Sequence, residues 1–594
     1  MTKTYEPTWD LDDLFSGGSS SVEFQNYLQE VEKELDHLAQ LVESFQHEHV
    51  RSNMNPFITL LHTLESTQKR LRDAGAFVSC LSAQNVHDKQ ATQLTGEMAI
   101  YSAKMNAIQT HFDQKLLEMD EDSWQYILNH PEISELAFVL QEKRNRAKEK
   151  LSAEEELLIN DLSVDGYNGW GQMYNTIVAG MSVDIHEDGQ VTSYSVGQAA
   201  NKLSHPDRAV RKHVFEQLGK AWQEKEDLFG QTLNHLAGFR LEKYKHRGWD
   251  DVLKEPLDIN RMTKETLNAM WGAISDNKRS FVTFLEKKAE LLGLDRLSMY
   301  DVNAPLTQSV KTSTYTEGAE FIIDHFRSFS PKMADFAQMA FERRWIEAED
   351  RAGKRPGGFC TSFPNREQTR VFMTYSGTSS NIATLAHELG HAYHQHVMND
   401  VNGLNQRYAM NVAETASTFA EMIVADASVD NAETDEEKRG LLADKIQRSI
   451  AFFMNIHARF LFETRFYDER KSGPVSVKRL NELMVEAQEE AYAGAIEDYD
   501  PHFWSSKLHF HITGVPFYNF PYTFGYLFSL GIYAHAKQKG GDFEDDYIAL
   551  LRDTGSMTVE ELAMKHLNVD LRKPAFWENA IKLCVDDVDE FLAL

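Results

Sequence analysis

Helical periodicity is the feature of this sequence that most restricts its fold. Through most of the 594 residues, apolar side chains recur at the three- and four-residue spacing of one helix face, with charged residues between them. Segments 22–42 and 56–77 show this pattern with heptad-like regularity. A chain patterned in this way is expected to form a mainly α fold of packed helices.

Two short segments depart from the helical pattern. Around Asp188-Gly189, apolar and polar residues alternate about a turn signal, which predicts a β-hairpin before helical spacing resumes near Val196. Residues 370–376 are rich in strand-forming side chains and end at a glycine, which predicts a single strand. The sequence therefore predicts only a small β component.

Acidic residues outnumber basic ones and give the chain a formal net charge of −30. Such a charge repels phosphate backbones and anionic lipid, so neither nucleic acid nor a membrane is an expected partner. Segment 510–536 is apolar and lacks charged side chains, but Pro516 and Pro521 interrupt it. This favours a buried segment over a membrane-spanning helix.

The cysteines and the N-terminus bear on the compartment. Cys80, Cys360 and Cys584 are too few and too widely spaced for a disulfide framework or a cysteine-rich metal site. The first ten residues lack the basic start and apolar core of a secretory signal. Both observations predict a cytoplasmic protein, and the sequence leaves its oligomeric state open between a monomer and a small homo-oligomer.

The most informative motif lies in segment 379–396, which has the periodicity of one helix. The N-cap candidates are Ser379, Ser380 and Asn381. His387 and His391 are four residues apart and project from one helix face, at a spacing that suits one Zn²⁺. Glu388 points aside, where its carboxylate can take a proton from a metal-bound water. His394 is expected to pack or to support the ligands rather than bind the metal.

A catalytic zinc needs three protein ligands and one open position, so a third ligand must come from elsewhere. Val397 stands where the metzincin pattern requires a histidine, which excludes that class. Glu414 lies within the apolar helical segment 408–426, where a carboxylate is costly to bury unless it is paired or bound to metal. Glu414 is therefore the predicted third ligand. Glu421, two turns further on, is the predicted partner that orients a ligand histidine.

These motifs resemble those of the thimet oligopeptidase family of zinc peptidases, and most closely its bacterial oligoendopeptidase F branch. The resemblance rests on His387-Glu-Leu-Gly-His-Ala-Tyr-His, Ala413-Glu-Thr-Ala-Ser-Thr-Phe-Ala-Glu, the opening Trp9-Asp-Leu-Asp-Asp-Leu-Phe, the predicted hairpin, and the His- and Tyr-rich run after Phe510. By similarity, His387, His391 and Glu414 bind one zinc ion per chain, and Glu388 is the general base.

The resemblance also implies an architecture. The expected body is elongated and two-lobed, with a deep central channel and a small β-sheet beside the active-site helix. We divide the chain into an N-terminal helical lobe, residues 1–200, with the hairpin near its end, and a catalytic metallopeptidase domain, residues 201–594.

Peptide hydrolysis requires hydrogen-bond donors for the tetrahedral oxyanion. The family takes a histidine and tyrosines for this purpose from the loop that corresponds to the run after Phe510. We select His511, Tyr518 and Tyr522 as catalytic residues. Tyr526 and His509 are held in reserve.

The sequence thus predicts a zinc-dependent oligoendopeptidase that hydrolyses internal bonds of short peptides by a metal-activated water, with a glutamate general base. The predicted strand 370–376 is expected to pair with an extended peptide backbone. One alternative is a zinc carboxypeptidase with the same ligands, which would need a cation for the terminal carboxylate of its substrate. The other is a non-enzymatic peptide-binding protein on a degenerate hydrolase fold. Cobalt and manganese also remain open as native metals.

Overall fold

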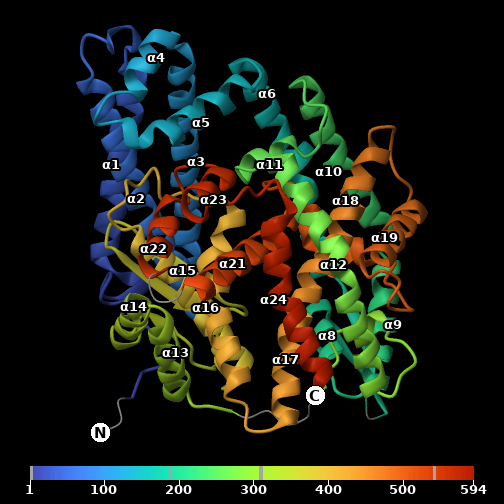
Figure 1. Ribbon diagram of the computed structural model, residues 1–594. Coiled ribbons are helices and arrows are strands. Elements are labelled where there is room, and N and C mark those ends of the chain that lie inside the picture. The colour runs from blue at the N-terminus through green and yellow to red at the C-terminus, as the bar shows by residue number, and fades with distance from the viewer. Residues whose placement is uncertain (1–3, 188, 307–311, 540–542) are drawn as a thin grey trace. The chain divides into compact units, whose positions relative to one another are not determined.

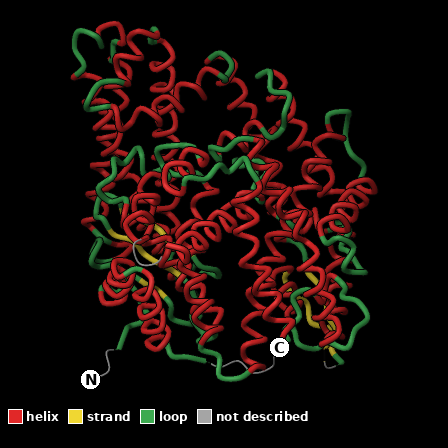
Figure 2. The backbone as a smooth tube through the Cα atoms, viewed as in Figure 1, coloured by secondary structure: helices red, strands yellow, loops and turns green. Residues whose placement is uncertain are grey.

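The computed structural model describes residues 4–187, 189–306, 312–539 and 543–594. Helices make up most of these residues and the strands form two small sheets, which confirms the predicted mainly α fold (Figures 1 and 2). Within the same ranges, no helix is both long and apolar enough to cross a membrane.

The chain divides into two compact units, and each unit is assembled from three separate stretches of sequence. Unit 1 contains residues 1–149, 311–427 and 535–568. Unit 2 contains residues 150–310, 428–534 and 569–594. The division of the chain into an N-terminal lobe, residues 1–200, and a catalytic domain, residues 201–594, stays a prediction.

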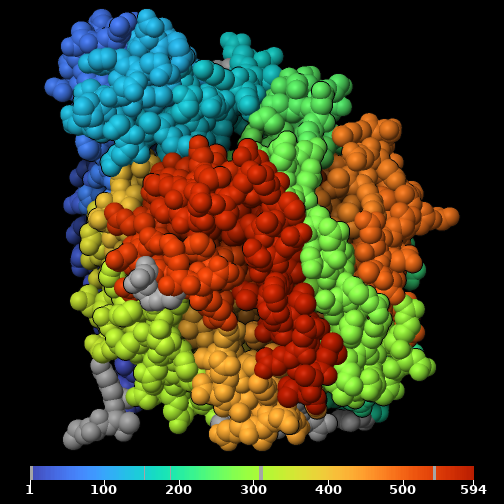
Figure 3. Space-filling model, in the orientation of Figure 1, coloured from blue at the N-terminus to red at the C-terminus, as the bar shows by residue number. Residues whose placement is uncertain are grey.

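Unit 1 combines long N-terminal helices with the helix that carries the metal-binding motif. Its helices are α1 (Val22–Ser44), α2 (Asn55–Gln84), α3 (Lys89–Glu118), α4 (Glu121–Leu128), α5 (Ala137–Lys148), α13 (Tyr315–Phe329), α14 (Pro331–Glu342), α15 (Ser379–Val397), α16 (Met410–Asp430, which continues past the unit boundary), α22 (Phe543–Asp553) and α23 (Val559–Leu567). Leu35, Phe57 and Phe112, from α1, α2 and α3, are fully buried and share one apolar core. The heptad-like stripes in the sequence therefore become the contacts between these helices. Figure 3 shows α22 and α23 at the surface on this face of the molecule.

A three-stranded sheet lies beside the metal helix. Its strands are β3 (Ile346–Glu347), β4 (Phe359–Phe363) and β5 (Gln368–Phe372), in the order β3-β5-β4. Both α2 and α15 pack against this sheet, so the predicted β-sheet beside the motif helix is confirmed. Phe363 and Phe372 join the apolar core with side chains of α2.

The sheet order corrects one expectation about the substrate. The predicted strand 370–376 corresponds to β5, which is the central strand: it pairs in parallel with β3 and in antiparallel with β4. The predicted strand overlaps β5 at residues 370–372, where β4 occupies one edge and β3 pairs with Val371 and Phe372 on the other, so the expectation of peptide pairing is wrong for this stretch. Among the described residues, no strand pairs with the outer edge of β4.

Unit 2 is also mostly helical. Its helices are α6 (Ala153–Ser163), α7 (Gly169–Ala179), α8 (Val196–Asn201), α9 (Arg208–Gln223), α10 (Glu226–His246), α11 (Lys254–Ile259), α12 (Lys264–Leu291), α17 (Asp435–Ile450), α18 (Ile456–Arg470), α19 (Val477–Ala491), α20 (Phe503–Ser506), α21 (Phe520–Lys539, which ends in unit 1) and α24 (Pro574–Ala593). The predicted hairpin is confirmed as β1 (Ser182–Glu187) and β2 (Gln190–Ser195). Its turn includes Gly189, whose φ of 78° favours glycine, while Asp188 lies outside the described residues.

Candidate metal centre

The metal-binding motif lies on α15, and the start of this helix is fixed by a capping box. The Thr378 side chain accepts a hydrogen bond from Asn381 N, and the Asn381 side chain accepts one from Thr378 N. The cap is therefore Thr378, one residue before the predicted candidates. From this start the helix places His387 and His391 one turn apart, with their ring centroids separated by 4.9 Å.

The third predicted ligand approaches both histidines from α16. Glu414 Oε2 lies 3.3 Å from His387 Nε2 and 3.6 Å from His391 Nε2. Ligand atoms held about 2.1 Å from one tetrahedral zinc lie roughly 3.4 Å apart, so the spacing fits a single ion. The three ligand atoms also lie within 4.8 Å of one another. Two imidazoles and one carboxylate form a donor set that suits catalytic zinc.

Close packing of the two ligand helices depends on Gly390, which lies between the histidines on α15. A Cβ at this position would lie 2.5 Å from Ala416 O and 2.6 Å from Ser417 Cα, both on α16. No real Cβ tolerates such distances to backbone atoms. The absence of a side chain at residue 390 therefore lets α16 bring Glu414 to the histidines.

Electrostatic interactions keep the ligands in their metal-binding forms. Burial favours the neutral acid of Glu414, but the hydrogen bond with His387 and the neighbouring imidazoles outweigh it and lower its pKa to about 2. Burial and the charge of His387 lower the pKa of His391 to about 4. Metals bind carboxylates and neutral imidazoles, so both groups are ready to coordinate near neutral pH.

Further contacts orient the imidazoles. The buried carboxylate of Glu421, on α16, places Oε2 at 3.1 Å from His387 Nδ1, the contact expected of a group that orients a ligand histidine. His391 donates a hydrogen bond to the backbone of Ala413. With one ring nitrogen of each histidine held in this way, the other is directed toward Glu414.

Glu388 is the buried acid of the site. Its side chain is only 7% exposed, and Oε2 has no hydrogen-bond partner among the described residues. Burial raises its pKa to about 7; His387 opposes this rise, and Glu414 adds to it. A Cβ at Gly358, just before β4, would lie 3.2 Å from Glu388 Oε1. This close approach places the start of β4 beside the carboxylate.

His394 has a packing role. It is fully buried, and its Nε2 lies 3.2 Å from Leu551 O and 2.9 Å from Thr554 Oγ1. Its other face stacks on Tyr408, with 4.2 Å between the ring centroids. These contacts fasten the second half of α15, which agrees with the predicted supporting role.

The remaining predicted residues belong to unit 2, where the structure groups two of them. Tyr518 and Tyr522 are partly exposed, with ring centroids 5.7 Å apart, and His509 lies 5.5 Å from Tyr518 by the same measure. Sequence reasoning ranked His509 below His511 and kept it in reserve. The structure adds that all three side chains are partly exposed, which the sequence does not reveal.

His511 and Tyr526 are both buried. His511 is 1% exposed and stacks on Tyr174, with 4.0 Å between ring centroids, and burial lowers its pKa to about 3. The Tyr526 hydroxyl lies 2.9 Å from Ser449 Oγ inside unit 2. Burial also lowers the pKa of His509, to about 4, so both histidines are neutral near pH 7; His511 is fully packed, whereas His509 is partly exposed.

Comparison with known proteins assigns the family. The model described as Peptidase family M3 matches residues 202–583, and the model described as Oligopeptidase F matches residues 115–182. The first match covers well over half of the chain. The chain therefore belongs to peptidase family M3 and is a metalloendopeptidase.

Individual relatives extend over nearly the whole chain. Oligopeptidase PepF of Bacillus subtilis is 22% identical over 98% of this chain and 87% of its own. The oligoendopeptidase F homologue of Borreliella burgdorferi is 22% identical over 97% and 96%, respectively. Among solved structures, oligoendopeptidase F from Enterococcus faecium gives a TM-score of 0.69 at 17% identity, covering 96% of this chain and 98% of that one. Pz peptidase A with an inhibitor gives 0.72 at 16% identity, covering 95% and 97%. These likenesses show a shared fold.

Proposed function

We propose that the protein is a zinc-dependent oligoendopeptidase that hydrolyses internal bonds of short peptides. The observation that carries this proposal is the convergence of His387, His391 and Glu414 beside the buried carboxylate of Glu388. A zinc ion bound by these three ligands supplies Lewis-acid polarisation and lowers the pKa of water. Glu388 accepts the proton of the attacking water and delivers it to the leaving amine. Its raised pKa suits both transfers.

The outer edge of β4 is the proposed track for the substrate backbone. Gly358, the residue just before this strand, lies beside Glu388, and among the described residues no strand occupies the outer edge of β4. An extended peptide that pairs with such an edge gains main-chain hydrogen bonds that do not depend on its side chains. Binding of this kind supports an enzyme that accepts many sequences.

Hydrogen-bond donors for the oxyanion are proposed to come from the run after Phe510. Tyr518 and Tyr522 have the required hydroxyl groups and are partly exposed within unit 2. The accompanying histidine is either His511, which the sequence selected, or His509, which the exposure favours. Substitution distinguishes the two.

His509→Gln is expected to lower kcat by about 10²-fold, the usual effect of removing one transition-state donor, with little change in thermal stability. His511→Gln is expected to lower the midpoint of thermal unfolding, because it places a new polar group in a packed site, at a cost of about 1–3 kcal/mol. Steady-state kinetics and calorimetry on both variants measure these effects. A large loss of kcat in His511→Gln at unchanged stability would restore His511 as the catalytic histidine.

Cleavage of peptides blocked at both ends tests the endopeptidase assignment. We expect internal cleavage of an acetylated, amidated peptide, because neither free terminus is needed by an edge-strand binding mode. Mass spectrometry of the fragments identifies the cut, and an intact folded protein serves as the comparison substrate. Products that appear only from peptides with a free C-terminus would instead indicate the carboxypeptidase alternative.

The compartment and the native metal of the enzyme can also be proposed. We propose that it acts in the cytoplasm on short peptides, which is supported by the separate thiols of Cys80, Cys360 and Cys584. Zinc is the proposed native metal because the ligand set is two histidines and a glutamate.

A further inference from the structure

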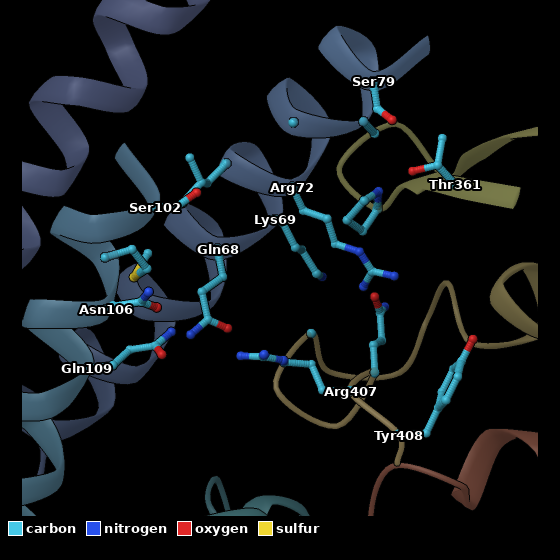
Figure 4. A pocket seen from close by; sticks show the side chains of 17 residues that line it. Gln68, Lys69, Arg72, Ser79, Ser102, Asn106, Gln109, Thr361, Arg407 and Tyr408 are labelled. Atoms are coloured by element: carbon cyan, nitrogen blue, oxygen red, sulfur yellow. The ribbon is translucent and has the colours of Figure 1, made fainter. Parts of the chain in front are cut away.

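Unit 1 contains a cavity of about 640 Å³ outside the metal centre (Figure 4). Its walls are side chains of α2, α3 and β4, together with the loop that precedes α16. Figure 4 shows Lys69 and Arg72 extending from α2 and Arg407 from the loop opposite. None of the residues proposed to bind zinc or to transfer protons lines this cavity.

The cavity is positively charged. Lys69, Arg72 and Arg407 line it, and none of its lining residues is acidic. Such a cluster is unexpected in a chain with a net charge of −30. Lys69 is balanced by Glu65 at 2.8 Å, whereas Arg72 donates a hydrogen bond to the neutral amide oxygen of Gln395 at 3.1 Å. The guanidinium of Arg72 therefore gives the cavity a positive charge that a carboxylate would neutralise.

Strand β4 connects this cavity to the metal centre. Gly358, just before the strand, lies beside Glu388, and Thr361 of the strand lines the cavity. Three residues of extended chain span about 10 Å, so a peptide paired with the outer edge of β4 reaches the cavity about three residues from the bond next to Glu388.

Electrostatic interactions show the same proximity. Burial raises the pKa of the Cys360 thiol, on β4 between the two places; the charge of Glu388 adds to this rise and that of Arg72 opposes it. Burial likewise raises the pKa of Tyr408, which lines the cavity, to about 12; Arg72 opposes this rise and Glu414 adds to it. Cavity and metal centre are neighbours within one unit.

We propose that this cavity binds a carboxylate of the peptide substrate, about three residues from the scissile bond. The carboxylate is either an Asp or Glu side chain or the terminal carboxylate, since both present the same two oxygens to a guanidinium. The proposal rests on the peptidase function proposed above. It implies that the enzyme accepts many peptide sequences but prefers substrates that have a carboxylate at one position.

The test uses otherwise neutral peptides in which one position at a time is Asp or Asn, each made with a free and with an amidated C-terminus. The measured quantity is the ratio of kcat/KM between the members of each pair. For the wild type we expect a ratio of about ten at one position or at the terminus, as for a charge-assisted contact of about 1.4 kcal/mol. The position identifies the source of the carboxylate. The ratio should fall as salt is added.

Substitution of the two arginines removes the guanidinium groups of the cavity and leaves Lys69 with its partner Glu65. Arg72→Gln and Arg407→Gln, singly and together, are expected to bring the ratio toward one, and Arg72→Lys should retain part of it. Arg146→Gln is the matched control, because Arg146 lies on α5 of the same unit, pairs with Glu142 at 2.9 Å and does not line the cavity. Thermal unfolding of each variant separates loss of the preference from loss of the fold.

Wild-type ratios near one at every position and at the terminus would overturn the proposal, as would a preference that survives in the double variant. Fluorescence anisotropy of labelled Asp and Asn peptides with Glu388→Gln measures binding without turnover. If the wild type cleaves no peptide, the proposed function fails, yet the anisotropy pair still reports whether the cavity selects a carboxylate.

Discussion

Glu388→Gln is expected to lower kcat by about 10²- to 10⁴-fold, the usual contribution of a general base, while the bound zinc is retained. Glutamine has nearly the same shape as glutamate, so the buried site, 7% exposed, keeps its packing. It cannot accept the proton of the attacking water. The three ligands come from other residues, so metal content should not change.

Two measurements on the same sample check this outcome: metal content by atomic absorption and single-turnover cleavage of a blocked peptide. Retained zinc with lost turnover supports the assigned base. Glu414→Ala provides the contrast, because it is expected to lose zinc and activity together. Unchanged turnover in Glu388→Gln would refute the role of Glu388.

Gly390→Ala is expected to weaken zinc binding by about 10- to 100-fold, the range seen when the supports of a metal ligand are disturbed. The added methyl group would press on the backbone of α16 at Ala416 and Ser417, within 2.6 Å. The helix must move outward, and Glu414 moves with it. Overpacking of this kind also costs about 1–3 kcal/mol of stability.

Gly96→Ala is the matched control for this substitution. Gly96 lies on α3 of the same unit, and a Cβ there meets nothing within 4 Å. The exchange should leave zinc affinity unchanged and raise stability by up to about 1 kcal/mol, because alanine favours the helix. Competition with a zinc chelator and thermal unfolding give both quantities. Equal zinc affinities in the two variants would show that the contact at residue 390 does not position Glu414.

The clustering of His387, His391 and Glu414 was predictable because local patterns encode it. His387 and His391 share a face through helical periodicity alone, and Glu414 stands out as a carboxylate within an apolar helical segment. The cap was missed by one residue, because Thr378 acts through a reciprocal contact with Asn381. Element boundaries depend on such pairs more than on composition.

Other features depend on contacts between distant segments, and no local pattern reveals them. β5 is the central strand only because the two-residue β3 pairs with it, and two residues give no periodicity. His511 is buried by Tyr174 of α7, which is more than 300 residues earlier in the sequence. Each unit is also assembled from three separate segments of the chain, which no local sequence pattern predicts.

The contacts that hold α15 in place form only after a much later part of the chain has been synthesised. The partners of His394 on the far side of the metal helix lie 157 and 160 residues later in the sequence. His387, His391 and Glu414 therefore all leave the ribosome well before the stretch that completes the packing of α15. A nascent chain at that stage carries the hydrolytic residues without their native support. Peptidase activity should thus appear late in synthesis, after most of the enzyme has been made.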